Sequence, residues 1–65
     1  MYVPGNLVKV RKAIYSSGPS MRIAEGTVGV ILQGPTKGYE GHCQVQFVAV
    51  NEPWWVNFSE IEPHH

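Results

Sequence analysis

Few side chains in this sequence have the chemistry that catalysis requires. The single cysteine, Cys43, directly follows His42. Adjacent residues of an extended strand point to opposite faces of a sheet, so this histidine cannot deprotonate the thiol by direct contact. A metal site built from His42, His64 and His65 would lack a fourth ligand. We therefore expect no enzymatic activity, no metal and no cofactor, and we expect Cys43 to pack in the core as a small apolar residue.

The adjacent tryptophans, Trp54 and Trp55, are a stronger signal, and they indicate binding. In a strand, Trp54 shares its face with Val56 and Phe58, which places Trp54 in the core and Trp55 on the opposite face. An exposed tryptophan is a good anchor for a protein partner, because tryptophan is enriched among the residues that dominate binding energy. The alternative is that a long first loop folds over Trp55 and covers it.

The elements that must position these residues are short strands. Seven glycines and five prolines divide the 65 residues into short segments, and no segment keeps the 3.6-residue apolar period of a long helix. Alternating and β-branched segments predict strands instead. We expect strands over residues 6–14, 26–33, 42–49 and 54–58, long loops over 15–25 and 33–41, a 3-10 turn over 59–61, and a last strand over 61–63.

Two of these strands have informative faces. The apolar positions that alternate with their neighbours in the clearest strand are Cys43, Val45, Phe47 and Ala49. That strand is expected to bury one face. The apolar residues that share one face of the segment 26–33 are Val28, Val30 and Leu32. Gly29 between them indicates a bulge or a close approach of another part of the backbone.

The order of these elements resembles the SH3-like small barrel. The motifs that carry the resemblance are Gly-Thr-Val-Gly-Val-Ile at 26–31, Val-Gln-Phe at 45–47 and Trp-Val-Asn-Phe-Ser-Glu-Ile-Glu at 55–62. The resemblance implies one all-β domain over residues 1–63, a five-stranded SH3-like barrel with a long first loop and a single 3-10 turn before the last strand. His64 and His65 are expected to be the remnant of a purification tag or a disordered tail.

Within this superfamily, the layout is similar to stand-alone accessory subunits. Examples are the peripheral SH3-like subunit of photosystem I, the barrel subunit of ferredoxin–thioredoxin reductase and small SH3-like phage proteins. Such barrels dock on a larger partner, which implies a non-catalytic interaction module. Two other members match less well. The segment 55–58 lacks the Val-Gln-Ile-Tyr pattern that lines the pore of plasmid-type dihydrofolate reductases. The acidic first-loop residues with which eukaryotic SH3 domains bind proline-rich peptides are also missing.

The charge balance is neutral, with five lysines and arginines against five glutamates. A protein that binds nucleic acid by neutralising phosphates usually carries an excess of basic residues, so the composition disfavours that class. In an SH3-like barrel the first and last strands are antiparallel neighbours. The resemblance therefore implies that Lys9 and Arg11 lie across from Glu60 and Glu62.

Two binding functions remain open. The residues expected to bind a larger protein, or a second copy of the chain, are Trp55, Tyr15, Tyr39, Arg22 and Lys12. The alternative resembles the KOW-like barrels of ribosomal and transcription-elongation proteins. In that case Lys12, Arg22 and Lys37 would contact the nucleic-acid backbone, and Tyr15 or Trp55 would stack on a base. We expect no membrane insertion, because no apolar segment is long enough, and a cytoplasmic location, because no signal peptide is visible and the only thiol is unpaired.

Overall fold

The computed structural model describes residues 2–15, 22–38, 40–48 and 50–64. Within these residues it contains short strands and one turn of 3-10 helix, and it contains no α-helix. In chain order the elements are β1 (Leu7–Val10), β2 (Ile14–Tyr15), β3 (Arg22–Ile23), β4 (Val28–Gln33), β5 (His42–Phe47), β6 (Trp54–Asn57), η1 (Phe58–Glu60) and β7 (Ile61–Pro63). The predicted all-β class is confirmed.

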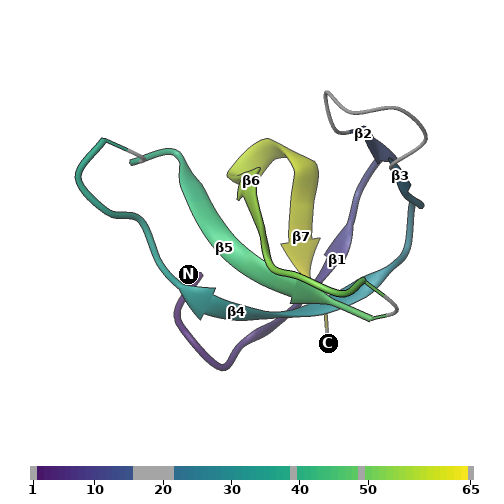
Figure 1. Cartoon of the computed structure of the whole chain (residues 1–65), viewed down its shortest axis with the longest axis horizontal. Coiled ribbons are helices and arrows are strands. Elements are labelled where there is room, and N and C mark those ends of the chain that lie inside the picture. The colour runs from purple at the N-terminus through teal and green to yellow at the C-terminus, as the bar shows by residue number, and fades with distance from the viewer. Residues whose placement is uncertain (1, 16–21, 39, 49, 65) are drawn as a thin grey trace.

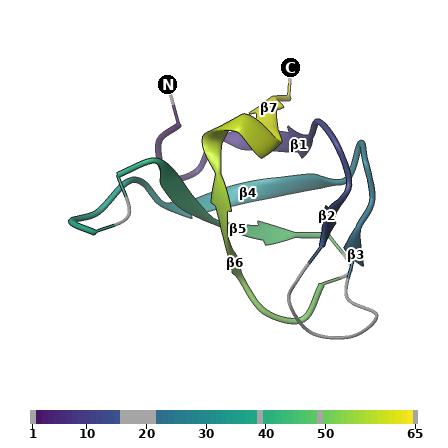
Figure 2. The ribbon, with the colours of Figure 1, turned by 90° about the horizontal axis from the view of Figure 1, so that it is seen from above.

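Five strands form one antiparallel sheet in the order β6-β5-β4-β1-β7. This sheet curls into a half-barrel, and its last strand, β7, returns to lie beside the first (Figure 1). β2 and β3 form a separate two-stranded sheet, which lies at one end of the half-barrel (Figures 1 and 2). The structure thus shows a curled five-stranded sheet with a 3-10 turn before its last strand.

The inner face of the half-barrel holds the core. Its buried side chains are Val8, Val10, Ile14, Ile23, Ile31, Cys43, Val45, Phe47, Val56 and Ile61. All of them are apolar, and no polar or charged side chain is buried among the described residues. The alternation predicted for β5 is confirmed at its described positions, because Cys43, Val45 and Phe47 are at most 2% exposed.

The first predicted strand, residues 6–14, is divided between the two sheets. β1 ends at Val10, whose carbonyl accepts a hydrogen bond from the Gly26 amide at 2.8 Å. The chain then leaves the main sheet, and Ile14 begins β2 by pairing with Ile23 of β3. Both isoleucines are buried, so leaving the sheet places two more apolar side chains in the core.

The face of β4 that carries three apolar residues points outward. Val28 and Val30 are half-buried and Leu32 is 42% exposed, whereas Ile31 on the other face is only 1% exposed. Gly29 lies on the inner face opposite Phe47. A Cβ atom at this position would lie 2.6 Å from Val45 Cγ1 and 2.8 Å from Phe47 Cδ1. The predicted close approach at Gly29 is therefore present, and the ladder irregularity lies further along, between Ile31 and Gln33.

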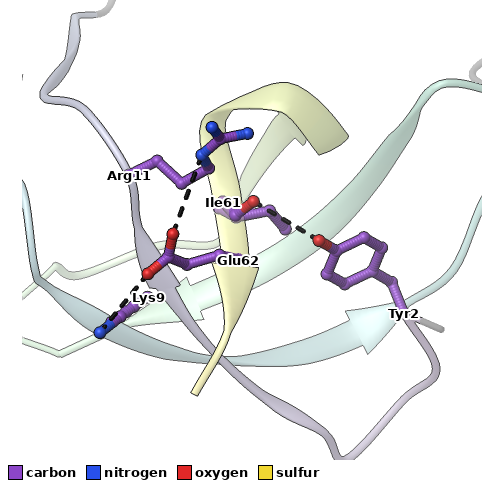
Figure 3. Close-up of polar contacts among 5 residues, drawn as sticks. All are labelled: Tyr2, Lys9, Arg11, Ile61 and Glu62. Atoms are coloured by element: carbon purple, nitrogen blue, oxygen red, sulfur yellow. Dashed lines mark hydrogen bonds and ion pairs between the residues drawn. The ribbon is translucent and has the colours of Figure 1, made fainter.

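The segment before β1 closes the end of the half-barrel near η1. The ring of Tyr2 stacks on Phe58 with centroids 5.0 Å apart, and its hydroxyl donates a 3.5 Å hydrogen bond to the carbonyl of Ile61 (Figure 3). The Gly5 amide donates to the Ile31 carbonyl at 2.8 Å, which ties this segment to β4. Tyr2 and Phe58 thus cover apolar core that the five strands leave open.

Candidate binding surface

The outer face of the main sheet carries the side chains that alternate with the core. Cys43 points inward on β5, so Gln44 points outward, and its neighbour across the ladder is Trp55 of β6. On an adjacent row of the same face, Leu7 of β1 pairs with Val30 of β4. Leu7 is 49% exposed and Trp55 is 37% exposed. We call Leu7, Val30, Gln44 and Trp55 the outer strip.

Amide side chains on this face are held in place by hydrogen bonds. Gln33 Nε2 donates to Gln44 Oε1 at 2.9 Å, across the ladder between β4 and β5. Gln46 Nε2 donates to the carbonyl of Val50 at 2.6 Å and to that of Phe47 at 3.2 Å. These side chains are therefore ordered in the free protein, which lowers the entropy that a partner would have to overcome on binding.

The basic residues of β1 and its end share one acidic partner on the same face. Lys9 Nζ lies 3.4 Å from one carboxylate oxygen of Glu62, and Arg11 Nε lies 3.8 Å from the other (Figure 3). The cross-strand charge pairing implied by the sequence is present, but both cations share Glu62. Glu60 has a different role, because its Oε1 accepts the backbone amide of Asn57 at 2.9 Å and so caps η1.

The two tryptophans occupy the positions expected for them. Trp54 is half-buried and packs against the core, whereas Trp55 lies on the outer face. This difference follows from the alternation of β6, in which Val56 is 1% exposed and its neighbours on either side point away from the core.

The other predicted binding residues come from several elements. Tyr15, 70% exposed, and Arg22 are cross-strand neighbours on β2 and β3, in the separate sheet. Lys12 is exposed in the connection between β1 and β2. Lys37 lies in the connection between β4 and β5, at the end of the molecule opposite β2 and β3 (Figures 1 and 2). Tyr39 lies outside the described residues.

Sequence reasoning did not identify Leu7 or Gln44 as surface residues of interest. A signal for both was present, since each lies one position out of phase with a buried apolar residue, Val8 or Cys43. The pairing of Gln44 with Trp55 and of Leu7 with Val30 depends instead on the register between strands, which the local pattern does not specify.

Two side chains of the described residues have a pKa shifted from its usual value, Cys43 and Glu40. Burial raises the pKa of the Cys43 thiol above its usual value, which keeps it protonated and unreactive. Hydrogen bonds from the backbone amides of Gly38 and of Glu40 itself lower the pKa of the exposed Glu40 carboxylate. Within the described ranges, no three histidine, cysteine or acidic side chains are placed to hold a metal ion.

A shallow depression lies at the end of β1, beside η1. It has a volume of about 460 Å³ and is lined by Arg11, Lys12, Ala13, Ser59 and Glu60. One candidate residue from the sequence, Lys12, therefore lines a concave site, while Trp55 lies on the outer face of the sheet.

Comparison with known proteins adds no further identification. No family model, no curated protein and no solved structure matches this chain. In the part of the chain that the structure describes, no helix has the length and apolar character needed to cross a bilayer.

Proposed function

We propose that this chain is a non-catalytic interaction module of the SH3-like type, which docks on a protein partner through the outer strip. The observation that carries the proposal is the exposed indole of Trp55, which lies beside the ordered Gln44 amide on the same face as Leu7 and Val30. Aromatic and aliphatic anchors surrounded by satisfied polar groups are typical of the centre of protein interfaces.

The electrostatics of the outer face support a protein partner. Lys9 of β1 and Arg11 just after it both pair with the single carboxylate of Glu62, which partly offsets their positive charge. A surface that binds nucleic acid gains most of its affinity from cations that are free to contact phosphates. The shared pairing with Glu62 lowers what these two cations would contribute to phosphate binding, which favours a protein partner for this face.

The SH3-like assignment is supported by the layout of the elements. The last strand pairs with the first, a long connection that holds β2 and β3 separates β1 from β4, and η1 separates β6 from β7. The curled five-stranded antiparallel sheet is also compatible with an SH3-like barrel.

Site-directed photo-crosslinking tests the proposal. A photoreactive amino acid would replace Gln44, in the outer strip, and separately Glu52, which is exposed in the connection between β5 and β6. The expected result is a protein adduct, with a partner or with a second copy, from position 44 and a much weaker adduct from position 52. Adding Trp55→Thr, which keeps strand propensity, should remove the adduct while circular dichroism shows a folded protein.

Equal adducts from both positions, or adducts from position 44 that persist in Trp55→Thr, would contradict docking through the outer strip. When position 44 gives the stronger adduct and Trp55→Thr removes it, light scattering on the purified protein distinguishes a second copy from a different protein. A mass above that of one chain assigns the adduct to self-association, and a monomer mass assigns it to a different protein.

The alternative function, nucleic-acid binding, is favoured by one observation. Tyr15 and Arg22 face each other across β2 and β3, and both are exposed, which would allow a base to stack on the ring beside a cation. Titration of single-stranded RNA at several salt concentrations tests it. Three phosphate contacts predict a slope of about −2 in log affinity against log salt. Loss of binding in Arg22→Ala but not in Trp55→Ala would favour this function over protein docking.

A further inference from the structure

The depression beside η1 has two walls of opposite hydrogen-bonding character. One wall is formed by Arg11, Lys12 and Ala13, and the other by Ser59 and Glu60 of η1. A backbone hydrogen bond from the Arg11 amide to the Glu60 carbonyl, 2.9 Å long, joins the two walls. The volume of about 460 Å³ falls within the range of about 300–1,000 Å³ that holds small ligands or a few side chains.

The η1 wall is rigid and presents hydrogen-bond acceptors. The amide and the hydroxyl of Ser59 both donate to Asn57 Oδ1, each at 3.0 Å. Glu60 Oε1 accepts the Asn57 amide at 2.9 Å, which completes a capping box. These bonds use the donors of the wall. The Ser59 hydroxyl oxygen and the second oxygen of the Glu60 carboxylate keep lone pairs that can accept further hydrogen bonds.

The opposite wall presents donors. Arg11 contacts Glu62 only through Nε, at 3.8 Å, and its terminal guanidinium nitrogens point away from that carboxylate (Figure 3). Lys12 is exposed, and it forms no ion pair with another residue of the described ranges. This wall can therefore donate hydrogen bonds to an anionic group without breaking an existing ion pair.

We infer that this depression binds a dipolar peptide segment, one that carries a carboxylate next to an ammonium or guanidinium group. The carboxylate would contact Lys12 and the terminal nitrogens of Arg11, and the cation would contact Glu60. A polyanion fits less well, because Glu60 and Glu62 lie beside the two cations and repel a run of phosphates.

This site is separate from the outer strip. Leu7 of the strip is the first residue of β1, and Arg11 follows the last. At ~3.3 Å per residue, Leu7 and Arg11 lie about 13 Å apart along the chain. A negative result for the depression therefore does not decide whether the outer strip binds a partner, and the reverse also holds.

Titration followed by ¹⁵N–¹H NMR tests the inference. The probes are four capped glycine–serine octapeptides with Glu-Lys, Glu-Gln, Gln-Lys or Gln-Gln at the centre, together with a single-stranded oligouridylate. The Glu-Lys peptide is expected to shift the amides of Arg11, Lys12, Ala13, Ser59 and Glu60, with a Kd of about 1–10 mM. The two singly charged peptides should bind about two- to fivefold more weakly, and Gln-Gln should produce no saturable shift.

Variants that remove one charge test whether each wall of the depression contacts the peptide. Lys12→Gln should weaken the Glu-Lys peptide about two- to fivefold, as should Glu60→Gln, in which glutamine can still cap η1. The matched controls remove the same charges elsewhere, as Lys37→Gln in the β4–β5 connection and Glu52→Gln in the β5–β6 connection. Both controls should bind as the unmodified protein does.

Any of four outcomes would overturn the inference. One is no saturable shift with the Glu-Lys peptide, and another is equal binding of all four peptides. The third is a tighter oligouridylate complex at the same amides with a salt slope of about −2 or steeper, which would assign the depression to nucleic acid. Equal weakening by the control variants would show long-range charge alone and would also overturn it.

Discussion

The two faces of the main sheet differ in how their apolar residues are used. On the inner face, side chains such as Phe47, Val45 and Ile31 are at most 2% exposed and pack against one another. On the outer face, Leu7 and Trp55 are also apolar but stay 49% and 37% exposed among hydrogen-bonded amides and a shared ion pair. The inner face holds the fold together, and the outer face is the one through which we propose that the protein binds.

This difference predicts that equivalent substitutions on the two faces have different effects. Removing atoms from the inner face leaves a cavity that a domain of 65 residues has little stability to tolerate. The same change on the outer face removes side-chain atoms that already contact solvent, so stability should change little. Its effect should be on partner binding.

The largest stability effect is expected from Phe47→Ala, in the middle of the core. The loss should be about 3–5 kcal/mol, because a large ring that is 2% exposed is replaced by a void. At about 0.05–0.15 kcal/mol per residue the whole domain is stabilised by a similar amount, so the variant should be largely unfolded. Urea denaturation followed by circular dichroism measures it.

The control is Val48→Ala at the next position, which is 65% exposed and should change the stability by less than about 0.5 kcal/mol. Equal losses for the two variants would mean that Phe47 does not pack in the core as assigned.

The next largest difference between the two faces is expected in the rate at which a thiol reagent labels a cysteine. Cys43 is 0% exposed, and burial raises its pKa, so a thiol reagent should reach it only when the domain opens. An opening free energy of about 3 kcal/mol slows labelling by a factor of at least ~100. A cysteine introduced as Gln44→Cys, on the outer face, should react at nearly the rate of a free thiol. Comparable rates at the two positions would contradict the burial of the inner face.

A smaller loss is expected from Gly29→Ala. The added methyl group would lie 2.6 Å from Val45 Cγ1 and 3.0 Å from the backbone oxygen of Gln46, so β4 and β5 would have to separate. Overpacking of this kind costs about 1–3 kcal/mol. Gly41→Ala is the matched control, because nothing lies within 4 Å of its added Cβ. A stable Gly29→Ala variant, measured by thermal unfolding, would show that the two strands are not in close contact at this point.

The smallest effect is expected on the outer face, from Glu62→Gln. This change removes the ion pairs with Lys9 and Arg11, whose side chains are 42% and 56% exposed, so the loss should be at most about 1 kcal/mol. The difference from the unmodified protein should shrink further in 0.5–1 M salt, where the Debye length falls to about 3–4 Å. A loss above about 2 kcal/mol that salt does not reduce would mean that this face contributes to stability as the inner face does.

Several features of the molecule follow from local sequence alone. The alternation around Cys43, Val45 and Phe47 identifies the buried face of β5, and the same reasoning separates Trp54 from Trp55. The short last strand, Ile61–Pro63, has its predicted bounds. These predictions succeed because side chains alternate with a period of two along any strand, whatever the strand pairs with.

Other features escaped prediction because they depend on distant contacts. The stacking of Tyr2 on Phe58 joins residues 56 positions apart, and no local pattern marks Tyr2 as part of the core boundary. Glu62, and not Glu60, became the partner of Arg11 because Glu60 is used to cap η1. The convergence of Arg11 and Lys12 with Ser59 and Glu60 likewise exists only once β7 pairs with β1.

By itself, then, the sequence determined the all-β class, the positions of most strands and the two faces of β5 and β6. The tertiary structure decided which face of β4 points inward. Val28, Val30 and Leu32 made one face the more apolar in sequence, yet Gly29 and Ile31 lie inside. The physical reason is steric, because the core needs room for Phe47 and Val45, and a glycine across the ladder supplies it. Apolar residues were thereby left on the outer face of β4, where they are half-buried or exposed.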